Sequence, residues 1–576
     1  MGSTAGLVDW RGRPVDTKKH GGARASMFIH ILVWLGNVAN IANSMNMVSY
    51  LRGTMNMGVA AASTTTTIFV AVLQMFTIPA AFIADSYMKR FYTVLIFAPF
   101  EILGYILLAI QAHVPSLHPP PCQVPNNCEP VHGSNLSLLL LGIYMICIGE
   151  GAIRACLPAL GGDQFDKSDP VEQRLEASFF NWYTFAVSFG GFVGLLFIVW
   201  VENNKGWDVG FSVCAGTVLL GLVVWAAGFP FYRNRLPAGS PLTRILQVLV
   251  AAFRKRNLQL YDGNPQNGLN HIAGGTTKGV EVLERTKGLE CLDKAAIDNG
   301  KGGSWSLCTV HQVEETKIVI RMIPIFITSA LGYMPASIIL TFTVQQGNTM
   351  NTKLGTISVP PATLFLIPTV FQLVILVVYD RFIVPFMRKK TGYVGGVTHL
   401  QRIGIGFVAA MMASMVAAIV EMKRKRVAEE SGLMDSPAPV PISVFWLVFQ
   451  FFFIGVVDVT SFVGLLEFFY SEASTGMKSI GSSLFYCMLG VAAWLVTLLI
   501  ELVNRVTRHG GRKQGWLDGA NLNRSKLDSF YWLVCILELV SFMVYLYWAW
   551  RYVYRNDQRV VEKGNKSPVD CDVEAI

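Results

Sequence analysis

Residues 67–110, TIFVAVLQMFTIPAAFIADSYMKRFYTVLIFAPFEILGYILLAI, contain two long apolar segments joined by a short charged turn. A helix needs about 20 mostly apolar residues to cross the hydrocarbon core of a bilayer, and each segment approaches that length. The turn holds Asp85, Lys89 and Arg90, and basic residues collect in cytosolic loops. The stretch therefore predicts two membrane spans and a cytosolic turn, where we expect Asp85 and Arg90 to lock helix ends rather than to contact a substrate.

The same apolar pattern recurs along the 576-residue chain and gives about twelve candidate spans. A polar segment, 233–314, divides them into two sets of six and is predicted to be a cytosolic linker. The expected bundles are 27–232 and 315–552, between cytosolic ends at 1–26 and 553–576. The individual spans are expected near 27–51, 61–85, 91–113, 137–160, 177–201, 209–232, 315–343, 361–387, 400–421, 440–470, 477–505 and 527–552. This pattern predicts an all-α polytopic membrane protein with the 6+6 layout of major facilitator transporters.

The composition fits a chain that is surrounded by lipid. Hydrophobic residues make up 52% and charged residues 15%, against about 25% charged residues in an average soluble protein. Basic cytosolic loops account for the net charge of +9, so no nucleic-acid partner is expected. The sequence has no glycine-rich phosphate loop, no spaced Cys/His cluster and no G-x-S-x-G motif, so neither an enzyme nor a metal or cofactor site is predicted.

Two features are assigned to the extracytosolic side. Cys122 and Cys128 lie in the proline-rich loop PPPCQVPNNCEP, where a local disulfide is one of two open alternatives. Asn135 and Asn523 begin N-x-S sequons, and Asn523 is the better glycosylation candidate because Asn135 lies close to a span. The basic loops at 421–426 and 508–515 oppose this orientation, but the first spans carry most weight in setting it.

Glu150, Arg154 and Asp458 are ionisable residues inside apolar spans, where a charge costs roughly 2.5–3.5 kcal/mol on insertion scales. Glu150 and Arg154, in IGEGAIRACLPALGGDQFD, are four residues apart and can pair on one face of a helix. They form either a self-neutralising structural pair or an anion site with a carboxylate beside it, and we favour the anion site because packing does not require two costly charges. Asp458 has no cation near it in the sequence, so it is a structural acid, pairs with another helix or carries a proton.

Eight motifs, in order, resemble those of one family. They are FIADSYMKRF (82–91), GGDQFD (161–166), SFFNWYTF (178–185), NKGWDVGF (204–211), SVPPATLFLIP (358–368), GVTHLQRIGIG (396–406), EFFYSEA (467–473) and NLNRSKLDSFYWL (521–533). The chain resembles, over nearly its whole length, the plant nitrate/peptide transporter family, part of the proton-coupled oligopeptide transporter group of the major facilitator superfamily. The stretch FYRNRLPAGSPLTRILQVLVAA (231–252) is most similar to the subfamily of abscisic acid, gibberellin and low-affinity nitrate importers.

The resemblance implies a central cavity, alternating access and, in most members, proton symport. Arg154 stands where the family has a lysine in its fourth helix, and Asp458 matches the acid of the tenth. The first-helix signature E-x-x-E-R/K, linked to proton coupling, is replaced here, with Val33 and Gly36 at the acid positions and Asn37 at the basic one. The nitrate-binding histidine that some members carry in the seventh helix has no counterpart.

Four asparagines follow one another at three-residue steps in the first span: Asn37, Asn40, Asn43 and Asn46. They fan across the helix, so some can line a cavity while others bond to neighbouring helices. The last two are typical of the family and are expected to bind substrate. Trp182 and Tyr333 are expected in an aromatic cavity wall, with plain packing as the alternative.

These features predict an alternating-access transporter of small organic anions, such as abscisic acid or gibberellin, or of nitrate. Arg154 would bind the anion, and Asp458 would either contact the substrate or act as a gate in the second half. Glu150 would carry the proton if transport is proton-coupled. The alternative is a transport-deficient sensor or partner protein of the same fold. By family resemblance the plasma membrane is expected ahead of the tonoplast, and no oligomeric state is predicted.

Overall fold

The computed structural model describes residues 7–17, 19–119, 129–166, 169–237, 239–258, 285–286, 288–298, 303–354, 357–358, 364–435, 438–508, 515–517 and 522–555. Among these residues, twelve helical segments are long and apolar enough to cross a membrane. This confirms the predicted all-α architecture with twelve spans. Cys122 and Cys128, the candidate disulfide pair, lie outside the described residues.

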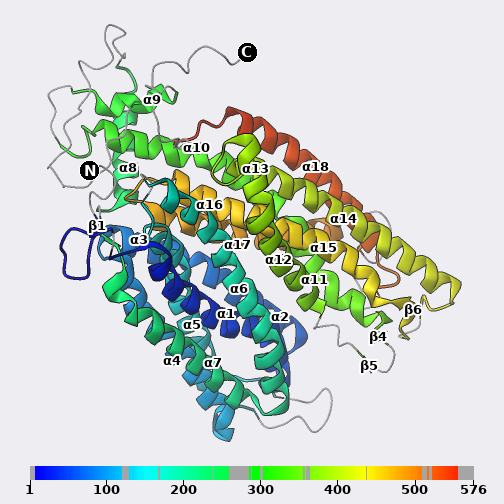
Figure 1. Cartoon of the computed structure of the whole chain (residues 1–576). Helices are drawn as coiled ribbons and strands as arrows, with labels where there is room; N and C mark the ends of the chain where they lie inside the picture. Colours follow the sequence, from blue (N-terminus) through cyan, green and yellow to red (C-terminus); the bar gives the residue numbers. More distant parts are fainter. Residues whose placement is uncertain are drawn as a thin grey trace.

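The first six spans lie together in one half of the molecule (Figure 1). They are α1 (Gly22–Gly53), α2 with α3 (Val59–Met75 and Thr77–Ser86), α4 (Arg90–His113), α5 (Gly133–Gly162), α6 (Pro170–Asn204) and α7 (Trp207–Ala227). Helix α4 packs along α5 and α7, and α1 packs along α6 and α7. The α4–α5 contact depends on Gly104, because a Cβ there would overlap the carbonyl oxygen of Gly142.

The second six spans form the other half and are more interrupted. They are α10 with α11 (Val310–Gly332 and Met334–Asn348), α12, η5 and α13 (Leu366–Val378, Tyr379–Ile383 and Val384–Thr391), α14 (His399–Glu430), η6, α15, η7 and α16 (Val444–Leu447, Val448–Val457, Asp458–Phe462 and Val463–Glu472), α17 (Lys478–Arg508) and α18 (Leu527–Arg551). Segments η5 and η7 are single π-helical turns, a geometry that often marks functional positions. Each turn carries an aspartate, Asp380 or Asp458.

Short elements lie at the two ends of the bundles. Helices α8 (Pro241–Arg254) and α9 (Glu290–Asp293) follow the first half in sequence and pack against each other and against the start of α10. The strands are β1 (Leu7–Val8) with β2 (Asn234–Arg235), β3 (Met350–Asn351) with β6 (Val440–Ser443), and β4 (Lys353–Leu354) with β5 (Ile357–Ser358). Figure 1 shows α8, α9 and β1 at one end and β4 to β6 at the other.

The two halves meet along a small number of helices. Helix α17 of the second half packs on α2, α3 and α5, while α6 of the first half packs on α12 and α16. The interface between the halves is therefore built mainly by α17 and α6, and the candidate site lies between these two helices.

Candidate functional site

A cavity of about 180 Å³ lies between the two halves. Its walls come from four spans of the first half and two of the second: Leu32, Val33, Gly36, Asn37 and Ile41 of α1, Gln74 of α2, Glu150, Ile153 and Arg154 of α5, Tyr183 and Val187 of α6, Phe462 of η7, and Tyr486 and Leu489 of α17. Glu150 and Arg154 are the charged side chains in this lining, so the predicted pair stands in the wall of a cavity.

The Glu150–Arg154 pair is largely buried and is held by hydrogen bonds that Arg154 donates. Arg154 Nε donates to Glu150 Oε1 over 2.6 Å, and Arg154 Nη1 donates to Gln74 Oε1 over 3.4 Å. The side chain of Glu150 is 2% exposed and that of Arg154 is 17% exposed, so the cation is the more accessible partner. Arg154 also lies over the ring of Tyr486, 5.6 Å from its centre, which adds a cation–π contact from the second half.

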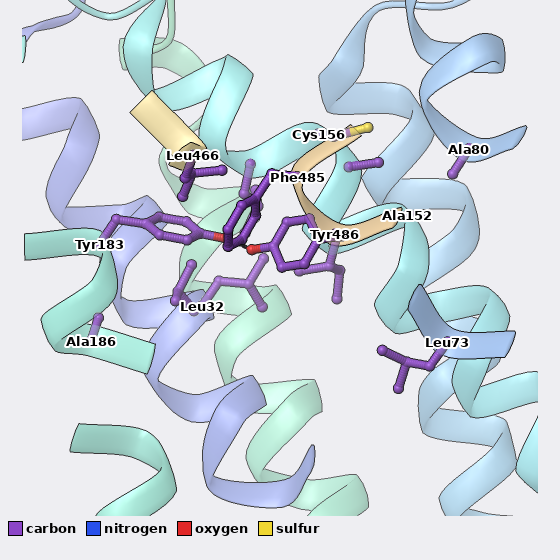
Figure 2. Close-up of a cluster of buried hydrophobic side chains, with 14 of the residues drawn as sticks. Leu32, Leu73, Ala80, Ala152, Cys156, Tyr183, Ala186, Leu466, Phe485 and Tyr486 are labelled. Atoms are coloured by element: carbon purple, nitrogen blue, oxygen red, sulfur yellow. Dashed lines mark hydrogen bonds between the residues drawn. The ribbon is translucent and has the colours of Figure 1, made fainter. Parts of the chain in front are cut away.

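Two tyrosines close the cavity across the halves. The hydroxyl groups of Tyr183 and Tyr486 lie 3.3 Å apart and share a hydrogen bond (Figure 2). Leu32 and Phe485 surround them in the close-up, so the contact is embedded in apolar side chains. Both rings are buried, which makes this hydrogen bond a direct connection between α6 and α17 beside Arg154.

The first helix presents an uncharged wall to the cation. Val33, Gly36 and Asn37, which the family resemblance sets at the acid and base positions of the first helix, all line the cavity. The amide of Asn37 donates to the carbonyl oxygen of Val33 over 2.7 Å, within its own helix. The substitutions therefore leave Glu150 as the carboxylate that neutralises Arg154 in this wall.

The other three asparagines of α1 bond to neighbouring helices. Asn40 donates to Glu101 of α4 over 2.8 Å, Asn43 donates to the sulfur of Cys214 over 3.2 Å, and Asn46 donates to Glu202 of α6 over 2.6 Å. The cavity lining contains Asn37 and not Asn43 or Asn46, the pair expected to bind substrate. The reason is that the side chains of Asn43 and Asn46 point from α1 into the first bundle, where they donate hydrogen bonds to the buried Cys214 and Glu202.

Asp458 and Tyr333 are neighbours in the second half. The Tyr333 hydroxyl donates to Asp458 Oδ1 over 2.9 Å, which supplies the partner that the sequence around Asp458 lacks. Neither residue lines the cavity around Arg154, although Phe462 from the same π-helical turn does. The two predicted site groups, Arg154 and Asp458, thus belong to different environments in this arrangement.

The turn between α3 and α4 locks more than two helix ends. Arg90 donates to Asp85 Oδ1 over 3.0 Å, forms an ion pair with Asp163, and donates to Ser479 of α17 over 2.7 Å. The backbone N–H of Ile480 also donates to Asp85 Oδ2. Although burial opposes ionisation, Arg235 and Arg90 hold the pKa of Asp163 below its ordinary value. We call these residues the first latch, because they tie α17 to the first half.

A second latch joins α6 to the π-helical turn η5, and sequence reasoning missed it. Asp380 accepts hydrogen bonds from Ser178 over 2.9 Å, Asn181 over 2.8 Å and Trp182 Nε1 over 3.2 Å. Trp182, expected in the cavity wall, is instead a donor in this latch. The one signal in the sequence was an aspartate near the end of an apolar span.

Comparisons with known proteins agree on one family. The model described as "PTR2: POT family" matches residues 91–517. The chain is 41% identical to Protein NRT1/PTR FAMILY 4.5 of Arabidopsis thaliana, over 95% of this chain and 96% of that protein. The chain belongs to the POT family. It is also 39% identical to Protein NRT1/PTR FAMILY 4.6 of the same plant, over 96% of this chain and 97% of the relative.

Solved POT-family structures share the fold. The crystal structure of an auto inhibited POT family peptide transporter matches with a TM-score of 0.60 at 17% identity, covering 93% of this chain and 98% of that one. A peptide transporter POT in complex with sulfate matches with a TM-score of 0.58 at 13% identity, covering 93% and 98%. The protein is accordingly a multi-pass membrane transporter with a small-molecule substrate, and it is not an enzyme.

The glycosylation expected at Asn523 in this POT-family chain does not fit its structure. Asn523 is 3% exposed, accepts a hydrogen bond from Arg424 and donates to the carbonyl oxygen of Leu433 over 3.1 Å. An amide nitrogen buried in such bonds has no room for a glycan. The sequon, which is read from three neighbouring residues, gives no sign of Arg424 about a hundred positions away.

Proposed function

We propose that this POT-family transporter carries small anions by alternating access and that Arg154 binds the anion. One observation supports this most directly: Arg154 lines the cavity as its cation and is more exposed than its partner Glu150. Its hydrogen bonds to described residues use Nε and Nη1, and Nη2 makes none to them. A guanidinium stays charged at physiological pH and can donate two parallel hydrogen bonds to a carboxylate or to nitrate.

The walls favour an organic acid as substrate. Leu32, Ile41, Val187 and Phe462 add apolar surface to the cavity that Arg154 lines. The volume of about 180 Å³ is below the roughly 300–1,000 Å³ typical of sites that enclose a drug-sized ligand. In this arrangement the cavity has room for nitrate or for the carboxylate end of a larger acid. A hormone-sized acid such as abscisic acid or gibberellin would need Tyr183 and Tyr486 to separate.

The two latches indicate which end is closed. The first latch lies at the α3–α4 turn, which the basic residues Lys89 and Arg90 assign to the cytosol. We propose that bundles 27–232 and 315–552 rock about the cavity, with the linker 233–314 and both chain ends on the cytosolic side. The cavity would then load from outside while both latches hold. Asp458, held by Tyr333, would meet a polar group of the substrate as the halves move.

The plasma membrane is the proposed location, since import of an external anion needs a cell-surface carrier. A fluorescent fusion in plant cells, compared with a tonoplast marker, tests this point separately from transport.

The transport test is uptake of labelled abscisic acid, gibberellin and nitrate in oocytes, with water-injected cells subtracted because weak acids also cross as neutral forms. We expect R154Q to lose about tenfold or more of the specific uptake, because it removes a charge-assisted bidentate contact. R154K, which restores the family's lysine, should recover much of it. R52Q, the same change at an exposed position of α1, is the matched control. Unchanged uptake in R154Q at equal surface expression would reject the anion clasp. No uptake in the wild type would favour the sensor alternative.

A further inference from the structure

Among the residues that the structure describes, the first half buries two glutamates that form no ion pair. Glu101 of α4 is 0% exposed and accepts a hydrogen bond from Asn40, and Glu202 of α6 is 1% exposed and accepts one from Asn46. One oxygen of each carboxyl, Glu101 Oε2 and Glu202 Oε1, is buried without a hydrogen-bond partner among the described residues. An ionised carboxylate in such a setting is costly, so the neutral, protonated form is favoured.

Glu101 differs from Glu202 in its position beside Arg154. Gly149 has no side chain, and a Cβ there would overlap the Cβ and backbone of Glu101, so α4 touches α5 one residue before Glu150. The charged groups that act on Glu101 are Glu150 and Arg154 of α5. On its own helix, the Tyr105 hydroxyl donates to Asn40 Oδ1 over 3.1 Å, and Glu202 and Cys214 lie around that tyrosine from α6 and α7. Both carboxyls therefore lie within electrostatic range of Arg154, and Glu150 is the one that bonds to it.

Building on the proposed anion site, we propose that Glu101 and Glu150 form one carboxyl pair. This pair exchanges protons with the solution so that the charge of Arg154 stays neutralised. With the cavity empty, the pair holds one proton, on Glu101, while Glu150 is ionised and bound to Arg154. When a monovalent anion occupies Arg154, Glu150 takes a second proton from solution onto its oxygen. The anion brings one negative charge and the proton one positive charge, so the charge of the buried site does not change.

This pairing makes each carboxyl a substitute for the other. In E150Q, Glu101 gives up its proton and becomes the counter-ion of Arg154. In E101Q, Glu150 keeps that role. The loss of either acid leaves one that can titrate, and only the loss of both removes the linked proton. The pair thus replaces, from α4 and α5, the acids that α1 lacks at Val33 and Gly36.

A first test needs no ligand: the infrared carbonyl band of protonated carboxylic acids, recorded on the full chain in lipid nanodiscs. We expect E101Q, E150Q and the double variant E101Q/E150Q each to lower the band by the same amount, equal to one carboxyl. E150Q does so although Glu150 itself is ionised, because Glu101 loses its proton. E202Q is the matched control, since Glu202 is equally buried and held by an asparagine, and its effect should add to that of E150Q. An unchanged band in E150Q, or additive losses in E101Q/E150Q, would overturn the proposal.

A second test counts protons with each bound anion, by calorimetry of the same samples in buffers of different ionisation enthalpy. The probes are nitrate, which brings no titratable proton, and abscisate. The expected count is one proton per anion in the wild type, E101Q, E150Q and E150Q/E202Q, and none in E101Q/E150Q. A count of none in E150Q alone would overturn the proposal. If the wild type binds neither probe, the proposed anion site fails, while the infrared result still decides the carboxyl pair.

Discussion

Tyr183 of α6 and Tyr486 of α17 face each other across the two halves, with their hydroxyl oxygens 3.3 Å apart and Arg154 beside them. The contact is a hydrogen bond between the halves, and both tyrosines line the cavity. Its net strength, about 1 kcal/mol for a neutral pair, is small enough to break during a transport cycle.

We expect Y486F to shift the equilibrium toward separated halves by roughly fivefold, because it removes that one hydrogen bond while keeping the ring over Arg154. The measurement is the rate at which a membrane-impermeant thiol reagent labels a cysteine placed at Ile153 in the cavity wall. Y105F is the control, since Tyr105 donates to Asn40 within the first half alone. Equal labelling rates in Y486F and the parent would show that the tyrosine contact does not restrict the cavity.

The second latch concentrates several donors on one carboxylate. Asn181 and Trp182 donate to different oxygens of Asp380, so D380N keeps one acceptor oxygen and turns an N–H₂ group toward one of these two donors. Hydrogen bonds to a charged group contribute about 1.5–3 kcal/mol each, so the closed end should open more often by tenfold or more. Spin labels on the ends of α6 and α13, followed by distance measurements, report this opening. D528N removes a carboxylate that pairs with Lys425 inside the second half, and it should leave the distances unchanged.

Asp163 gives the first latch a defined acid response. Its pKa is held below the ordinary value of 3.8 by Arg235 and Arg90, so its ionised form stabilises the fold above that pH. The contribution is lost as the pH falls through the lowered pKa of the folded state. D163N should therefore lower the thermal midpoint at neutral pH, by an amount corresponding to about 1–3 kcal/mol, with the difference from wild type shrinking below about pH 4.

The control for this change is D435N. Asp435 also has a lowered pKa, caused by Arg524, but the side chains of that pair are 69% and 66% exposed. Solvent screens an ion pair of this kind, so its loss should leave the midpoint unchanged. If the thermal midpoint of D163N is lower than that of the wild type by the same amount at every pH, the shape of the side chain at position 163, and not its charge, accounts for the effect.

The sequence predicted the features that depend on neighbouring residues. Twelve spans were predictable because lipid demands long apolar helices. The Glu150–Arg154 pair was predictable because the two residues are about one helical turn apart. The partners of Asp380 lie about two hundred positions away, and the contact of Glu101 with Asn40 joins different helices. Such contacts depend on which faces pack, and hydropathy does not specify that. The direction of Asn43 and Asn46 was unpredictable for the same reason.

Asn523 provides a prediction about processing. Because its amide bonds to Leu433 and its carbonyl accepts from Arg424, we expect no glycan at this sequon in the folded protein. Without glycosidase treatment, the mature, surface-expressed parent should have the same gel mobility as N523Q, and treatment with a peptide N-glycosidase should change the mobility of both by the same amount. N523Q should also lower the thermal midpoint, because the buried Arg424 loses an acceptor at a cost of about 1–3 kcal/mol. S525A removes the sequon but keeps Asn523, so it separates the loss of a glycan from the loss of the Asn523 hydrogen bonds. A mobility shift in S525A would show that a glycan is attached at Asn523. It would also show that the loop is not closed over Asn523 when the glycosylating enzyme acts.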